Sequence, residues 1–522
     1  MADNNREAER STLYKTLWYM ACNFVHGGTV SPNDFKQYVF GMMFYRFISE
    51  NITNYINKGE IEAGNKNFNY ENLTDEEAKE IKDDLVNERG FFILPSQLFS
   101  NIQRKAKFDE NLNVTIETIF HAIEDSAKGT ESENDFNGLF ADFDVNSPSL
   151  GKTVAKRNEM LCKLLDGIAS MQLSINEKTS IDVFGDAYEY LMGMYASSAG
   201  QKGGEFYTPQ EVSELLTRLC TVGKTEVNKV YDPACGSGSL LLKAAKILGK
   251  ENVRQGFFGQ EINITTYNLC RINMFLHDIE YDKFNIANDD TLIAPAHWDD
   301  EPFEVIVSNP PYSKPWKGDD DPTLINDERY RPAGVLAPKS KADFAFIMHS
   351  LSWLATNGTA AIVCFPGIMY RGGAEKKIRQ YLVDNNFIDC IIKLPDNLFY
   401  GTSIETCIMV LKKGKSENKT LFIDASNLYI KVTNNNKLTQ DNISEIVKAY
   451  TERKDIEHFS RDIPNDELSE NDYNLTITNY IKPEKTKVEI NIRKLNSDIE
   501  DIVKKEAALR KEITNIIQEI ED

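Results

Sequence analysis

The strongest chemical signal in the sequence is the tetrapeptide Asn309-Pro310-Pro311-Tyr312, which directly follows the apolar run 303–307. Two consecutive prolines make a rigid loop whose carbonyl oxygens are not committed to a strand ladder. The Asn309 side-chain oxygen and the Pro310 carbonyl can therefore both accept from one planar amino group. Two such acceptors draw the amine lone pair out of conjugation and toward the methyl sulfonium of a donor. Positioning and electrostatics then suffice, and no general base is needed before the amine attacks the methyl group. Tyr312 offers a face on which a planar target can stack.

A second motif, Asp232-Pro233-Ala234-Cys235-Gly236-Ser237-Gly238, lies between the apolar run 229–231 and a segment of helical character, 239–248. Glycines after a strand let a ligand approach the backbone, and the next helix presents its N-terminus. The loop lacks both the Lys-Ser/Thr pair of a P-loop and the spacing of a dinucleotide site. A tight turn without a ligand is the alternative. Together with Asn309 downstream, the loop predicts S-adenosylmethionine as the methyl donor.

Two acids follow predicted strands. Glu261 ends the run 256–261, where an acid of a doubly wound sheet can accept from ribose hydroxyls. Asp290 lies where the next strand should end, and it could accept from the adenine amino group of the cofactor. Asp289 competes with Asp290 for that role, and an ordinary exposed acid is the alternative for Glu261.

These motifs require elements that position them. Residues 1–165 read as a helical domain, with a helix opening at Pro32, whereas 58–90 and 124–150 are polar and predicted to be loop-rich. Residues 166–480 alternate strands and helices, which predicts an α/β fold with a doubly wound mixed sheet. Expected strands are 229–231, 256–261, 303–307, 360–364, 388–393 and a final one at 403–411, with helices at 239–248 and 373–385.

The C-terminal segment 481–522 shows the 3,4 apolar spacing of a coiled-coil-like helix. Glu506 interrupts the apolar seam at one position. We expect this helix to pair with a partner chain; folding back onto its own domain is the alternative. The seam consists of Ile492, Leu495, Ile499, Ile502, Leu509, Ile513, Ile516 and Ile520.

The three motifs in this order resemble amino-methyltransferases in which cofactor motifs precede the catalytic one. The first of them is Glu205-Phe206-Tyr207-Thr208-Pro209. Further segments resemble the modification subunit of type I restriction–modification systems, closest to the branch typified by EcoR124-type enzymes. They are 35–39, 44–51, 138–144, 322–329 and 365–367. The resemblance implies the class I S-adenosylmethionine-dependent methyltransferase fold and transfer of methyl to adenine N6 in DNA, with base flipping.

The resemblance also implies site roles. Phe206, Thr208 and Pro209 would close over the methionine end of the cofactor, while Glu261 would bind its ribose and Asp290 its adenine. Asn309, Pro310, Pro311 and Tyr312 would hold the target, and Phe399 would stack on the flipped base; core packing beside Ile392 and Leu394 is the alternative for Phe399. No metal is expected. The other cofactor-binding candidates are Glu205, Tyr207, Gln210, Asp232, Pro233, Gly236, Ser237, Gly238 and Ser239.

Composition bears on partners and location. The chain has 522 residues and a net charge of −21. This charge is unfavourable for binding DNA phosphates and indicates that a partner supplies most of that contact.

Scattered cysteines without a C-x-x-C pair argue against a zinc site and against disulfides. No membrane span or signal peptide is evident, and the cysteine pattern fits a reducing cytoplasm, which the resemblance implies is prokaryotic. The polar segment 313–342 is expected to face DNA, with a solvated loop as the alternative.

The family implies a specificity subunit that reads DNA, a second copy of the modification subunit, a restriction subunit and double-stranded DNA as partners. Two other hypotheses remain open. The same motif suits methylation of protein glutamine or RNA adenine, because any planar amine fits two acceptors. The chain could also bind cofactor and serve mainly as a scaffold.

Overall fold

The computed structural model separates the chain into two compact units, Met1–Ile481 and Lys482–Asp522. The predicted domain boundaries at 165 and 480 stay predictions. The residues that the structure describes are 32–171, 183–198, 208–399, 403–432, 435–483 and 492–521.

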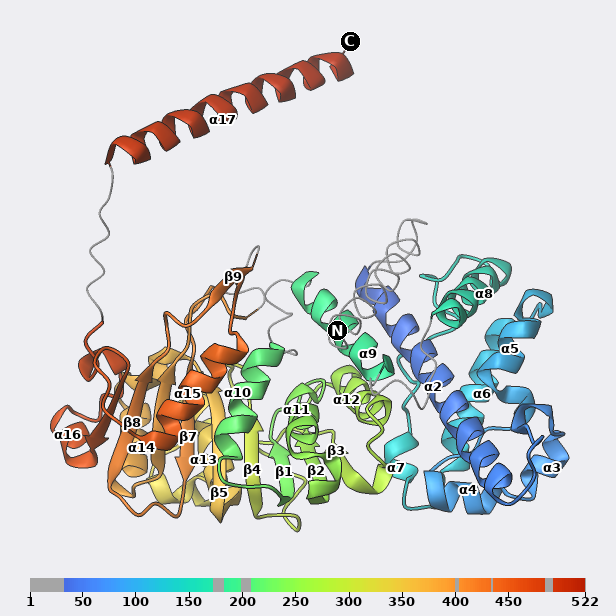
Figure 1. Cartoon of the computed structure of the whole chain (residues 1–522), viewed down its shortest axis with the longest axis horizontal. Coiled ribbons are helices and arrows are strands. Elements are labelled where there is room, and N and C mark those ends of the chain that lie inside the picture. The colour runs from blue at the N-terminus through green and yellow to red at the C-terminus, as the bar shows by residue number, and fades with distance from the viewer. Residues whose placement is uncertain are drawn as a thin grey trace. The chain divides into compact units, whose positions relative to one another are not determined.

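In the described part of the first unit, nine strands form one sheet in the order β11-β8-β6-β7-β5-β4-β1-β2-β3 (Figure 1). Neighbouring strands from β3 to β5 are parallel, β7 is antiparallel to both of its neighbours, and β11 is antiparallel to β8. The strands are β1 Val227–Asp232, β2 Val253–Gln260, β3 Phe284–Ala287, β4 Phe303–Ser308, β5 Leu354–Cys364, β6 Ile388–Lys393, β7 Cys407–Lys412, β8 Lys419–Asp424 and β11 Ser460–Pro464. A separate hairpin pairs β9 Ile430–Val432 with β10 Asn435–Lys437.

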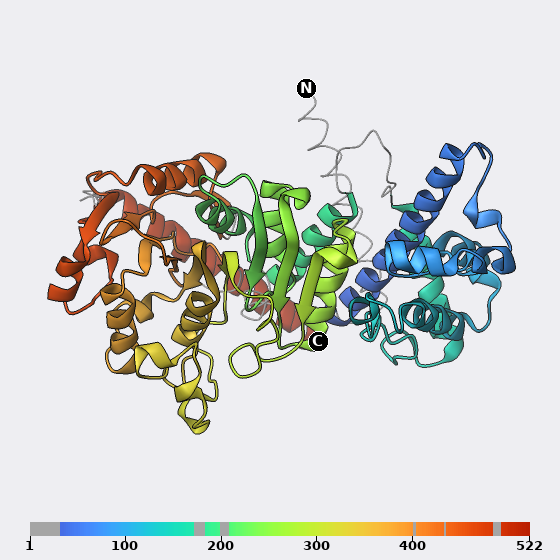
Figure 2. The ribbon, with the colours of Figure 1, turned by 90° about the horizontal axis from the view of Figure 1, so that it is seen from below.

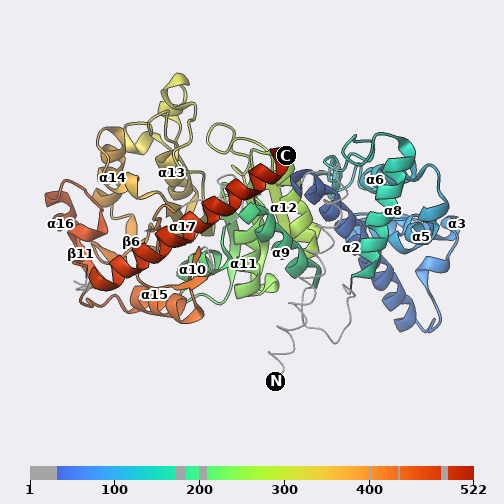
Figure 3. The ribbon, with the colours of Figure 1, turned by 90° about the horizontal axis from the view of Figure 1, so that it is seen from above.

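The sheet is doubly wound, because successive strand residues face different apolar clusters. Val230 packs with one cluster and Tyr231 with the other. On the Val230 side lie α10 Gln210–Cys220, α11 Ser239–Leu248, α12 Ile264–Leu276 and α15 Gln440–Glu452; on the Tyr231 side lie α13 Asp343–Trp353, α14 Ala374–Asp384 and α16 Asn465–Glu470 (Figure 3). The predicted mixed, doubly wound α/β sheet is confirmed.

The prediction that 403–411 is the final strand is wrong. β7 begins at Cys407, and β8 and β11 extend the sheet beyond it. β11 is a short edge strand that contains Arg461 and Asp462, so it lacks the apolar run that marks a buried strand.

The N-terminal residues form helices grouped beside the β3 end of the sheet (Figure 2). They are α2 Pro32–Glu62, α3 Asp75–Lys79, α4 Lys82–Arg89, α5 Phe99–Lys105, α6 Leu112–Ser126, α7 Glu133–Phe136, α8 Val154–Ser170 and α9 Val183–Ser198. The buried Arg271 of α12 joins this region to the sheet, since its Nη1 donates to the carbonyls of Asn134, Asp135 and Asn137 at 2.8, 3.2 and 3.1 Å. The predicted helix at Pro32 is present.

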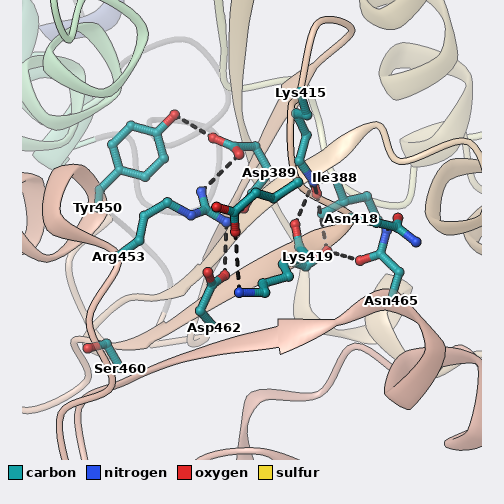
Figure 4. Close-up of polar contacts among 12 residues, drawn as sticks. Ile388, Asp389, Lys415, Asn418, Lys419, Tyr450, Arg453, Ser460, Asp462 and Asn465 are labelled. Atoms are coloured by element: carbon teal, nitrogen blue, oxygen red, sulfur yellow. Dashed lines mark hydrogen bonds and ion pairs between the residues drawn. The ribbon is translucent and has the colours of Figure 1, made fainter.

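An ionic cluster around the buried Asp389 joins the edge strand β11, which was not predicted from the sequence, to β6 (Figure 4). The Asp389 carboxylate of β6 accepts from the Tyr450 hydroxyl at 2.7 Å and from Arg453 at 2.9 Å, and it pairs with Lys412 at 3.3 Å. Arg453 also donates to Asp462 of β11 at 2.9 Å. Burial alone would raise the pKa of Asp389, but Lys412, Arg453 and Tyr450 outweigh burial and hold it below its ordinary value.

The second unit contains α17 Ile492–Glu521, so the C-terminal helix that the heptad spacing predicts is present. Ile499, Ile502, Leu509 and Ile513 of its seam are each half or more exposed. Pairing of this seam with another chain stays a prediction. Among the described residues, no helix is long and apolar enough to cross a bilayer.

Candidate active site

The glycine-rich loop connects β1 to α11 at the carboxyl edge of the sheet. Cys235 N–H donates to the Gln260 carbonyl of β2 at 3.0 Å, and Gly238 N–H donates back to the Cys235 carbonyl at 2.8 Å. Gly238 has φ +81°, and a Cβ there would lie 2.8 Å from Cys270 Sγ. Only glycine therefore fits this turn, which keeps the loop backbone close to β2.

Two carboxylates flank this loop. Asp232 is fully buried, and burial raises its pKa to about 7, with the nearby Glu261 adding to the rise and the Ala234 N–H and Ser308 hydroxyl opposing it. Glu261 accepts from Gly236 N–H at 3.1 Å and from Asn263 N–H at 2.8 Å, while burial raises its pKa. Asp232 Oδ2 makes no hydrogen bond of good geometry. A cationic ligand such as the sulfonium of S-adenosylmethionine would stabilise both ionised forms, so this donor set fits that cofactor.

Asp290 lies in the loop that follows β3. Its Oδ1 accepts from Leu292 N–H at 3.0 Å, whereas the more exposed Asp289 accepts from Asp290 N–H at 2.7 Å. Thr291 donates its hydroxyl to the Pro233 carbonyl at 2.6 Å, which joins this loop to the glycine-rich loop. The structure thus brings Pro233, Gly236, Glu261 and Asp290 to one edge.

The segment 313–342 differs from the expected DNA-facing loop. Arg329 is 1% exposed and donates to the carbonyls of Thr291 at 2.8 Å and Leu292 at 3.0 Å. Its charge is balanced by Asp327 at 2.7 Å. Arg329 therefore supports the loop of Asp290 from within and is not a surface cation. The segment contains the short helices η7 Gly318–Asp320, η8 Leu324–Asn326 and η9 Arg331–Ala333. DNA contact by its other basic residues stays a prediction.

The loop after β4 holds the predicted catalytic residues. Asn309 Nδ2 donates to Thr208 Oγ1 at 3.1 Å, and the Tyr312 hydroxyl donates to Asn309 Oδ1 at 2.6 Å. Pro310 is buried, and Pro311 is half-buried. Ser313 N–H donates to both Asp343 carboxylate oxygens, at 3.2 and 3.1 Å, which fixes the end of the loop on α13. The side chain of Asn309 is thus held at both of its polar ends.

The remaining predicted residues fall in three groups. Glu205, Phe206 and Tyr207 lie outside the described residues. Gln210 begins α10 behind Pro209, Ser239 begins α11, and the Ser237 carbonyl accepts from Asn273 at 2.8 Å. Phe399 is 2% exposed and belongs to the same apolar cluster as Ile392 and Leu394.

The buried position of Phe399 bears on its predicted role. Stacking on a base stays a prediction, and it requires a rearrangement that exposes the ring. The backbone beside it is held by the β9–β10 hairpin, because Asn436 N–H donates to the Asn397 carbonyl at 2.9 Å.

One exposed apolar residue beside the site was not among the residues predicted from the sequence. Ile262 directly follows Glu261 and is 67% exposed, which is unusual for isoleucine. An apolar residue just after the acid that ends a strand was the available signal. Among the described residues, no group of three or more His, Cys, Asp or Glu side chains could hold a metal ion.

Comparison with known proteins agrees with this geometry. The sequence model of the N-6 DNA Methylase family matches residues 179–489, and that of the HsdM N-terminal domain matches residues 13–168. The sheet and the site loops at its carboxyl edge form a mixed α/β methyltransferase fold with an N-terminal helical domain. The chain belongs to the N-6 DNA methylase family, as a methylase subunit of the type I restriction enzyme kind.

Three similar proteins illustrate this membership. The type I restriction enzyme MpnII methylase subunit of Mycoplasma pneumoniae is 47% identical, over 99% of this chain and 98% of its own. The MjaVIII methylase subunit of Methanocaldococcus jannaschii is 37% identical over 59% of this chain and 54% of its own. The solved type I restriction-modification system methyltransferase subunit from Streptococcus thermophilus is 34% identical, with a TM-score of 0.80, covering 90% of this chain and 99% of its own.

Proposed function

We propose that this chain transfers a methyl group from S-adenosylmethionine to the N6 amino group of adenine in DNA, at sequences chosen by a separate specificity subunit. The observation that carries the proposal is the fixed side chain of Asn309 beside Pro310, on the same sheet edge as the glycine-rich loop. Family membership supports adenine in DNA as the target.

In this proposal, one set of residues holds the cofactor and another holds the target amine. Asp232, Gly236 and Gly238, with Glu261, Asp290 and the segment 205–210, would hold the cofactor, which supplies an electrophilic methyl group. Ile262 offers an apolar surface for its adenine ring. Asn309 Oδ1 and the Pro310 carbonyl would accept the two amine protons of the target and turn its lone pair toward the methyl group. The proton leaves after transfer.

A base inside a duplex cannot reach this edge, so the target adenosine has to be flipped out of the helix. Tyr312 would then supply a stacking face, with Phe399 as a second aromatic once its ring is exposed. The unstacking energy is a few kcal/mol, and contacts of this kind offset it.

We further propose that the chain works in an assembly with a specificity subunit, a second copy of itself and a restriction subunit, in the cytoplasm of a prokaryotic cell. The net charge of −21 and the exposed seam of α17 support a partner that provides DNA contact and covers the helix. Assignment to the EcoR124-type branch stays a prediction.

The isolated chain is expected to bind duplex DNA weakly, with a Kd no tighter than about 10⁻⁶ M at physiological salt. Adding the specificity subunit should tighten binding and make it sequence-specific, because base reading would lie on that chain. Gel-shift titrations with and without the specificity subunit measure both. Tight, sequence-specific binding by the purified chain alone would contradict this division of labour.

The decisive experiment is methyl transfer by the chain co-purified with the products of its neighbouring genes. Labelled S-adenosylmethionine is supplied with duplex DNA, RNA or a release-factor protein in parallel, and the product on DNA is mapped. We expect N6-methyladenine in duplex DNA at one sequence. Labelling of protein or RNA alone would favour the alternative amino-methyltransferase, and a wild-type complex that assembles but labels none of the three would favour the scaffold.

A further inference from the structure

The hydrogen bond between Thr208 and Asn309 joins two motifs that are 101 residues apart in sequence. Thr208 belongs to the segment predicted to close over the cofactor, and Asn309 to the segment predicted to hold the target. We propose that Thr208 is a positioning residue that fixes the orientation of the Asn309 amide. This inference rests on the proposed function and deepens it.

The two ends of an asparagine side-chain amide have different hydrogen-bonding chemistry. Its carbonyl oxygen only accepts and its amide nitrogen only donates, so a half-turn about the last bond exchanges the two. Only one of the two orientations presents the acceptor that a target amine requires. A free amide would populate both, and the inactive orientation would present two N–H donors to an amine.

The structure shows what selects the orientation. Asn309 Nδ2 donates to Thr208 Oγ1 at 3.1 Å, which places Oδ1 at the opposite end of the amide. The Tyr312 hydroxyl donates to that oxygen at 2.6 Å. The amide is therefore held in a single orientation, because Oδ1 has a hydrogen-bond donor and Nδ2 has an acceptor.

Thr208 is suited to this role by its surroundings. It is 5% exposed and directly precedes Pro209, the residue before α10. The branched Cβ of threonine restricts χ1, so its hydroxyl is held in place at little entropic cost. Burial also removes water as a competing partner for the Asn309 amide.

The Tyr312 contact leaves Asn309 Oδ1 able to accept from a target amine. Its hydroxyl proton already occupies one lone pair of Asn309 Oδ1, and a carbonyl oxygen has two. An incoming amine can use the second lone pair or displace the tyrosine hydroxyl. In either case the orientation of the amide is fixed before the amine arrives, which is the preorganisation that raises the rate of the chemical step.

The test uses the complex with the specificity subunit and two substitutions at one position. Thr208→Val keeps the branched shape and removes the acceptor, whereas Thr208→Ser keeps the acceptor. Thr221→Val is the matched control, because Thr221 is a buried threonine at the opposite end of α10 and its hydroxyl donates to the Thr217 carbonyl at 2.9 Å. Steady-state methylation, S-adenosylmethionine binding by calorimetry and thermal melting are measured for each.

We expect Thr208→Val to lower kcat by about 10- to 100-fold, the range that misplacement of a catalytic group produces. Its Kd for S-adenosylmethionine should weaken by a smaller factor than kcat, because the hydrogen bond that the substitution removes is the one to Asn309. Thr208→Ser should recover most of kcat, and Thr221→Val should retain wild-type kcat.

Three outcomes would overturn the inference. Wild-type kcat in Thr208→Val means that the amide needs no such acceptor. A weaker Kd for S-adenosylmethionine with unchanged kcat assigns Thr208 to the cofactor alone. Equal loss in the Val and Ser variants points to packing. Absence of DNA methylation by the wild-type complex is a different result, and it would overturn the proposed function.

Discussion

Asn309→Ala is expected to reduce methylation of DNA by the assembled complex about 1,000-fold or more. Loss of a single preorganised hydrogen-bonding group at a reaction centre already costs about 100- to 1,000-fold. Here the change removes one of only two proposed acceptors for the target amine, and it frees Thr208 and Tyr312 from the groups that they now bind. The measurement is single-turnover methyl transfer to duplex DNA that carries the mapped sequence.

Two controls make that result specific. Asn471→Ala changes an exposed asparagine at the end of α16, and it should leave the rate unchanged. Co-purification of Asn309→Ala with the specificity subunit should also match wild type, because Asn309 lies in a loop at the sheet edge. DNA modification that survives at a comparable rate would show that Asn309 is not the acceptor of the target amine.

Asp389→Ala is expected to lower the free energy of unfolding of the first unit by about 1–3 kcal/mol, the cost of leaving partly buried hydrogen-bonding partners unsatisfied. Arg453 and Lys412 would lose their shared carboxylate, and the Tyr450 hydroxyl its acceptor. Urea unfolding followed by tryptophan fluorescence measures the change. Asp319→Ala, at an exposed acid, is the control and should fall within about 0.5 kcal/mol of wild type.

The same cluster gives a pH dependence with a definite sign. The folded pKa of Asp389 is lower than its ordinary value, so its contribution to stability is fully present above the unfolded pKa of about 3.9. It is lost as pH falls through the folded pKa. The difference between wild type and Asp389→Ala should therefore be constant near neutral pH and shrink in acid. A difference that grows on acidification would contradict the charge assignment.

The strands nearest the site were predictable because burial leaves a strong sequence signal. In β4, five of the six side chains are buried, and the run 303–307 contains four of them. The edge strand β11 gives no such run. In the polar segment 58–90, predicted to be loop-rich, α3 begins with a capping box between Thr74 and Glu77. That segment shows that local hydrogen bonds can specify a helix that hydrophobic periodicity does not reveal.

The sequence showed that the site motifs follow predicted strands, but it did not show the contacts between the motifs. Hydrogen bonds such as Thr208–Asn309 join residues that no local pattern relates. Arg329 is a residue whose burial could not be predicted from its type. Because arginine is rarely buried, the sequence predicts a surface position. In the structure, backbone carbonyls and Asp327 instead pair with the Arg329 guanidinium inside the protein. The apolar neighbours of Phe399 are consistent with core packing, but the sequence alone did not distinguish core packing from stacking on a base.

The central place of β7 has a consequence for biosynthesis. It lies between β5 and β6, although the chain forms both of those strands before it. During translation β5 and β6 therefore have no partner across the gap between them until Lys412 has left the ribosome. Their unpaired edges are open to association with other chains in that interval. Chaperone binding to nascent chains should accordingly persist until this late strand is inserted.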